Sequence, residues 1–137
     1  MVNKILGVVM IIGTLFLGSC ASNSSTTEEK NAKVEEVIST LDNVNEINFK
    51  SKKNVLLDVR TPEEFAEGHV PGAINIDVKN NNFTDEISKL DTKKNYYIYC
   101  KSGVRAKLAT DKMQEKGFKN AVNFKDGMST YKGTVTK

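Results

Sequence analysis

The chain has 137 residues, of which 39% are hydrophobic, and its 20 Lys and Arg against 17 Asp and Glu give a formal net charge of +3. This mild charge does not indicate a nucleic-acid-binding protein, which calls for a clustered basic face, and it does not oppose small anionic substrates. The sequence holds no internal repeat and no Gly-rich phosphate loop of the G-x-x-x-x-G-K type.

The first 19 residues are typical of a secretory signal peptide. Met1–Lys4 is short and positive, and Ile5–Leu17 is apolar, but this run is shorter than the about 20 residues that a spanning helix needs. Leu17-Gly18-Ser19-Cys20 resembles the bacterial lipobox, which implies cleavage before Cys20 and attachment of lipid, palmitate included, to that residue. The protein would then lie in the bacterial cell envelope, anchored outside the cytoplasmic membrane or in the periplasm or outer membrane. The alternative is an uncleaved N-terminal anchor.

The part of the chain after the signal divides into a tether and one domain. Residues 20–33 carry Cys20 and a polar stretch without apolar periodicity, which predicts a flexible tether. Residues 34–137 are of a length that suits a single domain. If Cys20 is lipidated, Cys100 is the remaining thiol, so no intramolecular disulfide can form and a structural zinc site is excluded. An unpaired cysteine in an exported protein is a candidate reactive thiol, although many free cysteines are small buried hydrophobic residues.

Short strands are predicted to alternate with short helices along this domain. Residues 34–40 hold a short strand or the start of a helix, and residues 41–49 are weakly helical. A continuous apolar run at Asn54–Val59 predicts a strand buried on both faces. Thr61, Pro62 and Glu64 form the pattern of a helix N-cap with a capping box. The other predicted elements are strands at 73–76, 96–99 and 121–124, and helices at 62–67, 83–90 and 104–116.

This alternation indicates an α/β fold with a mainly parallel sheet, in which ligands bind at the carboxyl ends of the strands. Asp58 and Cys100 both end predicted strands, so they could face one crevice. After Cys100 the chain turns through Ser102-Gly103 and opens a helix at Val104. Unpaired backbone N–H groups and the positive end of the helix dipole then lie beside the sulfur, where they favour the reactive thiolate and can hold an anion. The loop therefore predicts a nucleophile in an anion-binding cradle.

Three segments, Asp58–Phe65, Gly68–Ile76 and Tyr99–Arg105, together resemble those of a single-domain rhodanese and occur in the same order. The resemblance extends from about residue 34 to the C-terminus. It implies a three-layer α/β/α fold with a five-stranded, mainly parallel sheet, and a sulfurtransferase activity through a persulfide on Cys100. Near the C-terminus the family often has Gly-Gly-Met followed by Trp, whereas this chain has Asp126-Gly127-Met128 and Tyr131, a departure that we expect to alter packing rather than chemistry.

The resemblance also assigns roles within the loop. Its amides would bind the persulfide, and Arg105 would contact an anionic sulfur donor such as thiosulfate. The substrate-binding residues are then Lys101, Ser102, Gly103, Val104 and Arg105. We expect Asp58 and Arg60 to support the site structurally, with Arg60 pairing with Glu64 at the surface. His69 could act as a base, but a preformed thiolate needs no dedicated base.

Two other functions remain open on the sequence. A partner-binding or redox module would use Cys100 for a mixed disulfide or not at all. A phosphatase or arsenate reductase of the same fold uses a loop with five residues between Cys and Arg, as the resemblance implies, whereas four separate Cys100 from Arg105. The expected partners are a small anionic sulfur donor, a thiol or cyanide acceptor and the membrane through Cys20, with no nucleic acid, no cofactor and no metal. We expect a monomer.

Overall fold

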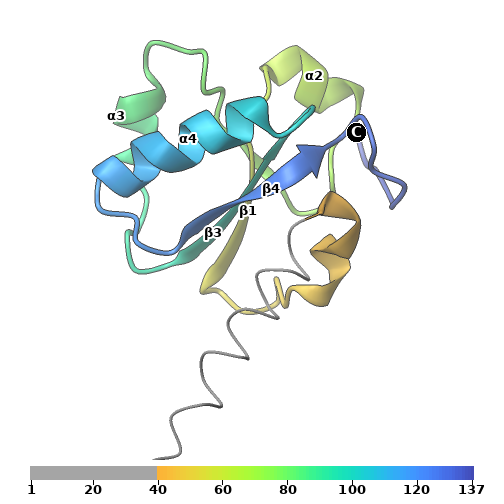
Figure 1. The fold of residues 1–137 in the computed structure, drawn as a ribbon, viewed down its shortest axis with the longest axis horizontal. Helices are drawn as coiled ribbons and strands as arrows, with labels where there is room; N and C mark the ends of the chain where they lie inside the picture. Colours follow the sequence, from red (N-terminus) through yellow and green to blue (C-terminus); the bar gives the residue numbers. More distant parts are fainter. Residues whose placement is uncertain (1–39) are drawn as a thin grey trace, which may run out of the picture.

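The computed structural model describes residues 40–137, in which helices and strands alternate along the chain (Figure 1). The elements are the 3₁₀ helix η1 (Leu41–Glu46), β1 (Asn54–Asp58), α2 (Pro62–Glu67), β2 (Ile74–Asn75), α3 (Phe83–Ile87), β3 (Asn95–Cys100), α4 (Val104–Glu115) and β4 (Ala121–Gly127). The predicted signal peptide, Cys20 and the tether lie outside the described residues. Over residues 40–137, no helix is long and apolar enough to cross a membrane.

The strands form one parallel sheet in the order β2-β1-β3-β4. The register pairs Asp58 with Tyr99 and Cys100 with Gly127, so the carboxyl ends of three strands meet at one edge. The expected fifth strand is wrong for residues 40–137, which contribute four strands. The strand or helix start that we placed at 34–40 falls outside the described residues apart from Thr40. The weakly helical stretch predicted at 41–49 forms a 3₁₀ helix over Leu41–Glu46.

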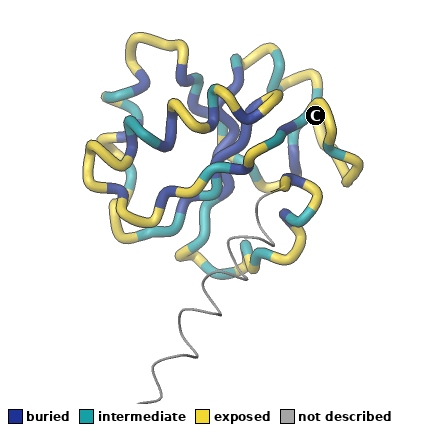
Figure 2. The backbone as a smooth tube through the Cα atoms, in the orientation of Figure 1, coloured by how far each residue is buried: buried dark blue, intermediate teal, exposed yellow. Residues whose placement is uncertain are grey.

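Apolar side chains cover both faces of this parallel sheet. On one face the strands pack against α3 and α4, and α4 crosses in front of the sheet in Figure 1. Buried members of this cluster include Leu57, Ile98, Phe83, Ile87, Ala109 and Met113. The other face packs against η1 and the C-terminal segment, and its buried members include Leu41, Val44, Leu56, Tyr99 and Phe124. Figure 2 shows the buried backbone concentrated in the central strands, which explains why β1 and β3 read as nearly continuous apolar runs.

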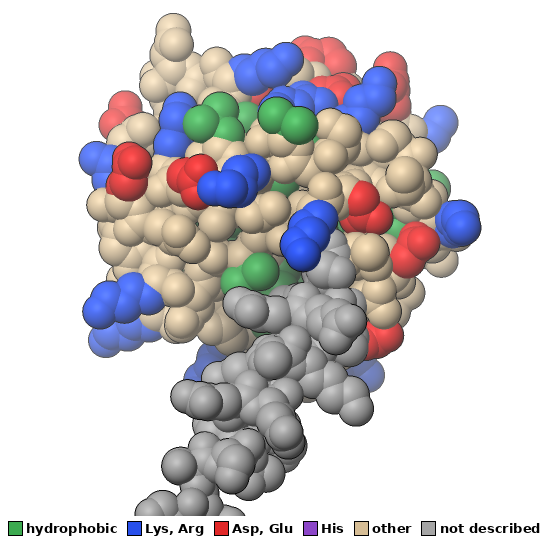
Figure 3. Space-filling model, viewed as in Figure 1, with side chains coloured by type: hydrophobic (Ala, Val, Ile, Leu, Met, Phe, Trp, Pro, Cys, Tyr) green, Lys and Arg blue, Asp and Glu red, His purple; other side chains and the backbone are tan. Residues whose placement is uncertain are grey.

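Local sequence signals place several element boundaries. Thr61 caps α2 through the predicted capping box, because its Oγ1 accepts the Glu64 N–H (3.3 Å) while a Glu64 carboxylate oxygen accepts the Thr61 N–H (3.2 Å). Several predictions were wrong in extent. The strand at 73–76 is limited to Ile74–Asn75, the helix at 83–90 ends at Ile87, and β4 continues beyond Phe124 to Gly127 because it stays paired with the end of β3. On the face in front in Figure 3, acidic and basic side chains are interspersed and apolar areas are small.

Candidate active site

The cysteine loop begins where β3 ends. Cys100 is fully buried, and its Sγ accepts a hydrogen bond from the Gly103 N–H at 3.1 Å. Gly103 has a φ of 92°, in the left-handed region that favours glycine. A Cβ at this position would also overlap the carbonyl oxygen of Lys125. Gly103 therefore has two independent reasons to be glycine, and both hold its N–H against the sulfur.

The helix that follows aims its N-terminus at the same sulfur. The first backbone hydrogen bond of α4 runs from the Lys107 N–H to the Gly103 carbonyl (3.0 Å). The N–H groups of Val104, Arg105 and Ala106 precede that bond and have no acceptor inside the helix. Together with the dipole of the 12-residue helix, they are the groups of the predicted cradle, and the binding of an anion to them stays a prediction.

The segment that follows β4 is hydrogen-bonded to the backbone of the cysteine loop, a contact that we did not predict from the sequence. The Met128 N–H donates to the Cys100 carbonyl (2.9 Å), and both the N–H and the Oγ of Ser129 donate to the Lys101 carbonyl (3.0 and 2.8 Å). Gly127 lies directly against this backbone, and a Cβ there would overlap the Cys100 carbonyl oxygen. The sequence feature that could have indicated this contact is Asp126-Gly127-Met128, which we expected to affect packing. Its Gly127 and Met128 also contact the backbone of the loop that carries the cysteine.

The Asp126 side chain has a specific partner in this arrangement. Its Oδ1 accepts the Leu41 N–H at 2.7 Å, 85 residues away, while Thr40, the N-cap residue of η1, makes no side-chain cap. Asp126 therefore caps η1 and ties it to the strand end beside the cysteine loop. The departure from Gly-Gly-Met thus alters packing, as expected.

Arg105 is held by an acidic residue of α2. Its Nη1 and Nη2 donate to the two carboxylate oxygens of Glu64 at 2.6 and 2.9 Å, a bidentate ion pair between side chains that are 18% and 28% exposed. The hydrogen bonds from Arg105 hold the pKa of Glu64 at about 2, below its usual value of 4.5. The same hydrogen bonds raise the pKa of Arg105. The predicted surface pair between Arg60 and Glu64 is therefore wrong, because Arg105 occupies the carboxylate.

Arg60 instead pairs with Asp58 in the interior. Arg60 Nη2 lies 2.6 Å from Asp58 Oδ2, with both side chains buried, and it also donates to the Gly68 carbonyl at 2.8 Å. Tyr99 packs beside this pair and accepts the Val70 N–H at 3.1 Å, and burial raises the pKa of its hydroxyl group. Asp58 and Arg60 thus have a structural role at the turn around Gly68, and their expected support of the site stays a prediction.

Asp58 and Cys100 do not share a crevice, although their strands are neighbours. Side chains alternate between faces along a strand, so Asp58 lies on the face of Leu56 and η1, whereas Cys100 belongs to the cluster of α3 and α4. His69 lies in the turn that follows α2. Its ring stacks on Phe65 (3.6 Å between centroids) and its Nδ1 lies 2.9 Å from the Phe65 carbonyl oxygen.

The remaining loop residues are exposed. Lys101 and Ser102 lie at the surface, and Val104 is 75% exposed at the first position of α4.

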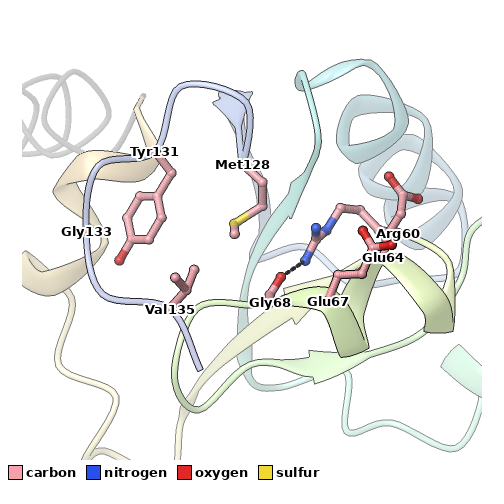
Figure 4. A pocket seen from close by; sticks show the side chains of 8 residues that line it. All are labelled: Arg60, Glu64, Glu67, Gly68, Met128, Tyr131, Gly133 and Val135. Carbon is pink, nitrogen blue, oxygen red and sulfur yellow. Dashed lines mark hydrogen bonds between the residues drawn. The ribbon is translucent and has the colours of Figure 1, made fainter. Parts of the chain in front are cut away.

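A pocket of about 360 Å³ lies next to the loop between α2 and the C-terminal segment (Figure 4). Its lining residues are Arg60, Glu64, Glu67, Gly68, Met128, Tyr131, Gly133 and Val135. The pocket thus includes Met128, which is hydrogen-bonded to the Cys100 carbonyl, and Glu64, the ion-pair partner of Arg105.

Several known proteins are similar to this chain in sequence. The putative sulfurtransferase YtwF of Bacillus subtilis is 37% identical over 78 residues, which are 57% of this chain and 73% of YtwF. A tRNA sulfurtransferase of Histophilus somni is 37% identical over 79 residues, which are 56% of this chain but 16% of that protein. The chain therefore matches most of a small relative and a short part of a large one.

Solved structures show the same fold. A rhodanese-like domain protein from Staphylococcus aureus superposes with a TM-score of 0.58 at 32% identity, covering 67% of this chain and 87% of that one. The human single-domain sulfurtransferase TSTD1 gives a TM-score of 0.53 at 26% identity, covering 66% and 89%. Residues 40–134 match the family described as the Rhodanese-like domain. The chain belongs to the rhodanese-like domain family.

Proposed function

We propose that this protein is a sulfurtransferase that carries sulfur as a persulfide on Cys100. The observation that supports it most is the position of the sulfur, which accepts the Gly103 N–H and faces the N-terminus of α4. Preorganised N–H donors that lie where negative charge develops lower the barrier of such a reaction. Relatives with the printed name sulfurtransferase point the same way.

The proposed reaction has two balanced steps. The Cys100 thiolate attacks the outer sulfur of a sulfane donor such as thiosulfate; a new S–S bond forms, the donor's own S–S bond breaks, and sulfite leaves with the electron pair. A thiolate or cyanide then attacks the outer sulfur of the persulfide, and the electron pair of the broken S–S bond returns to Cys100. Negative charge stays on sulfur throughout, so the loop amides stabilise the thiolate and the persulfide alike.

The test is the mass of the purified protein after treatment with a sulfane donor. We expect one added sulfur on Cys100, lost again when cyanide is added with release of thiocyanate, and neither event in Cys100→Ser. A protein that gains no sulfur from thiosulfate, a thiosulfonate or a low-molecular-weight persulfide contradicts the proposal. A specific disulfide partner without sulfur transfer would favour a redox-binding module, and Cys100-dependent hydrolysis of an aryl phosphate would favour a phosphatase.

We further propose that lipid on Cys20 anchors the protein in the bacterial cell envelope. The support is in the sequence, where an apolar segment ends at Leu17-Gly18-Ser19-Cys20. Metabolic labelling with a palmitate analogue should mark the wild type and leave Cys20→Ser unlabelled. A wild-type chain that retains residues 1–19 and carries no label would favour the uncleaved anchor.

A further inference from the structure

We propose that Glu64 selects the charge of the sulfur donor: by pairing with Arg105 it cancels the guanidinium charge at the end of the cysteine loop, and the site then disfavours dianionic donors relative to donors of lower charge. This inference rests on the proposed sulfurtransferase function and refines it. It also revises the role expected for Arg105, whose guanidinium faces a carboxylate rather than open space.

The geometry of the pair is fixed at both ends. Arg105 lies in the first turn of α4, two positions after Gly103, so its backbone belongs to the loop that surrounds the sulfur. Glu64 is the N3 residue of α2, and its Oε2 accepts both the Thr61 N–H (3.2 Å) and Arg105 Nη1 (2.6 Å). The carboxylate is therefore held in place by the capping box before any ligand arrives.

The charges around the sulfur show why this pairing matters. Arg105 follows by two positions the glycine whose N–H contacts the sulfur, so its charge belongs to the surroundings of Cys100. After Glu64, the groups that raise the pKa of Arg105 include Cys100 and Asp77, in agreement with that position. Glu64 already accepts hydrogen bonds from two nitrogens of the Arg105 guanidinium in a bidentate pair, the strongest geometry for such a contact. An incoming dianion must compete with that carboxylate, and the loop amides then supply most of its stabilisation.

Glu64→Gln tests this charge without disturbing the fold. Glutamine at N3 also completes a capping box with Thr61, so α2 keeps its N-terminus while Arg105 loses its counter-charge. Glu63→Gln is the matched control, because Glu63 is the exposed neighbour on the same helix turn and its removal changes the net charge by the same amount. Thiosulfate serves as the dianionic donor and methanethiosulfonate as the monoanionic one.

The expected result depends on the charge of the donor. From Coulomb interaction of one charge across about 10 Å of water-like medium, Glu64→Gln should raise kcat/KM about fourfold or more with thiosulfate and about twofold with methanethiosulfonate at low ionic strength. Salt of about 1 M, where the Debye length is about 3 Å, should remove most of this difference. Glu63→Gln should change either value less than twofold.

A double-mutant cycle tests whether the pair acts as one neutral unit. Arg105→Gln leaves Glu64 uncompensated, so we expect kcat/KM for thiosulfate to fall. Arg105→Gln with Glu64→Gln restores the charge balance and should return it toward the wild-type value, a non-additive result. If Glu64→Gln lowers thiosulfate turnover as Arg105→Gln does, or acts equally on both donors, the inference is wrong. Absence of any persulfide in the wild type would instead refute the proposed function itself.

Discussion

Gly127 lies against the carbonyl of Cys100 so closely that a single added methyl group cannot fit. An ideal Cβ at Gly127 would overlap the Cys100 carbonyl oxygen and lie 2.7 Å from the carbonyl carbon of Lys101. The same carbonyls accept the N–H groups of Met128 and Ser129. The backbone after β4 therefore determines where the cysteine loop lies, although 26 residues separate Gly127 from Cys100.

Gly127→Ala should consequently displace the loop. Overpacking of a tight contact costs about 1–3 kcal/mol, and the displaced loop should lose persulfide formation by more than tenfold, because the Gly103 N–H then no longer meets the sulfur. Urea unfolding and the rate of sulfur uptake on Cys100 measure the two effects. Gly72→Ala is the control: its Cβ meets no atom within 4 Å, so strain at its positive φ should lower stability while the rate stays near that of the wild type. Equal rates in both variants would contradict the proposed contact.

The buried pair between Asp58 and Arg60 gives a second prediction. Asp58→Asn leaves a buried guanidinium without its counter-charge, and breaking a buried pair in this way costs about 3–5 kcal/mol. Asp111→Asn is the matched control, because Asp111 pairs with Lys107 at the surface, where both side chains are about half exposed or more, and such pairs contribute less than about 1 kcal/mol. Urea unfolding should separate the two variants clearly. A similar small loss in both would show that Arg60 is solvated or finds another partner.

Sequence patterns predicted what depends on neighbours along the chain. The apolar run of β1, the capping box at Thr61 and the turn that leads from Cys100 into α4 are all local, and the structure has each of them. Partners distant in sequence were not predictable in this way. Glu64 was assigned to Arg60, four residues away, and instead binds Arg105, 41 residues away, because a pattern of charges does not specify which of them the fold brings together.

The contacts of the C-terminal segment illustrate the same limit. A glycine followed by Met128 reads as a turn, since nothing nearby in sequence indicates that a carbonyl from β3 will lie against it. The prediction that Asp58 and Cys100 face one crevice was wrong for a related reason. The ends of β1 and β3 were placed to within one residue, but the face to which each side chain points depends on where the alternation begins in each strand. The sheet edge was predictable, and the orientation at that edge required the structure.

Asp126→Ala should loosen η1. The substitution removes the acceptor of the Leu41 N–H, which lies 2.7 Å from Oδ1, and loss of a helix N-cap costs about 1 kcal/mol. We expect a lower free energy of unfolding and faster hydrogen exchange at the amides of η1. Thr130→Val is the control, because it removes the hydroxyl group that donates to Asp126 Oδ2 and to the Gly127 carbonyl, both at 3.2 Å, and leaves the bond from the Leu41 N–H to Asp126 in place. Unchanged exchange in η1 would show that its N-terminus does not depend on Asp126.

The ion pair between Glu64 and Arg105 predicts a pH dependence of stability. The pKa of Glu64 falls from 4.5 to about 2 on folding, chiefly because of the hydrogen bonds from Arg105, so folding favours the charged carboxylate. That contribution is complete above pH 4.5 and is lost as the pH falls toward 2. Wild type should therefore lose more stability than Glu64→Gln between pH 5 and pH 2.5, and the difference between their urea midpoints should shrink over that range. Glu63→Gln should keep a nearly constant offset from the wild type, and a constant offset for Glu64→Gln as well would mean that the pair does not depend on the charge of Glu64.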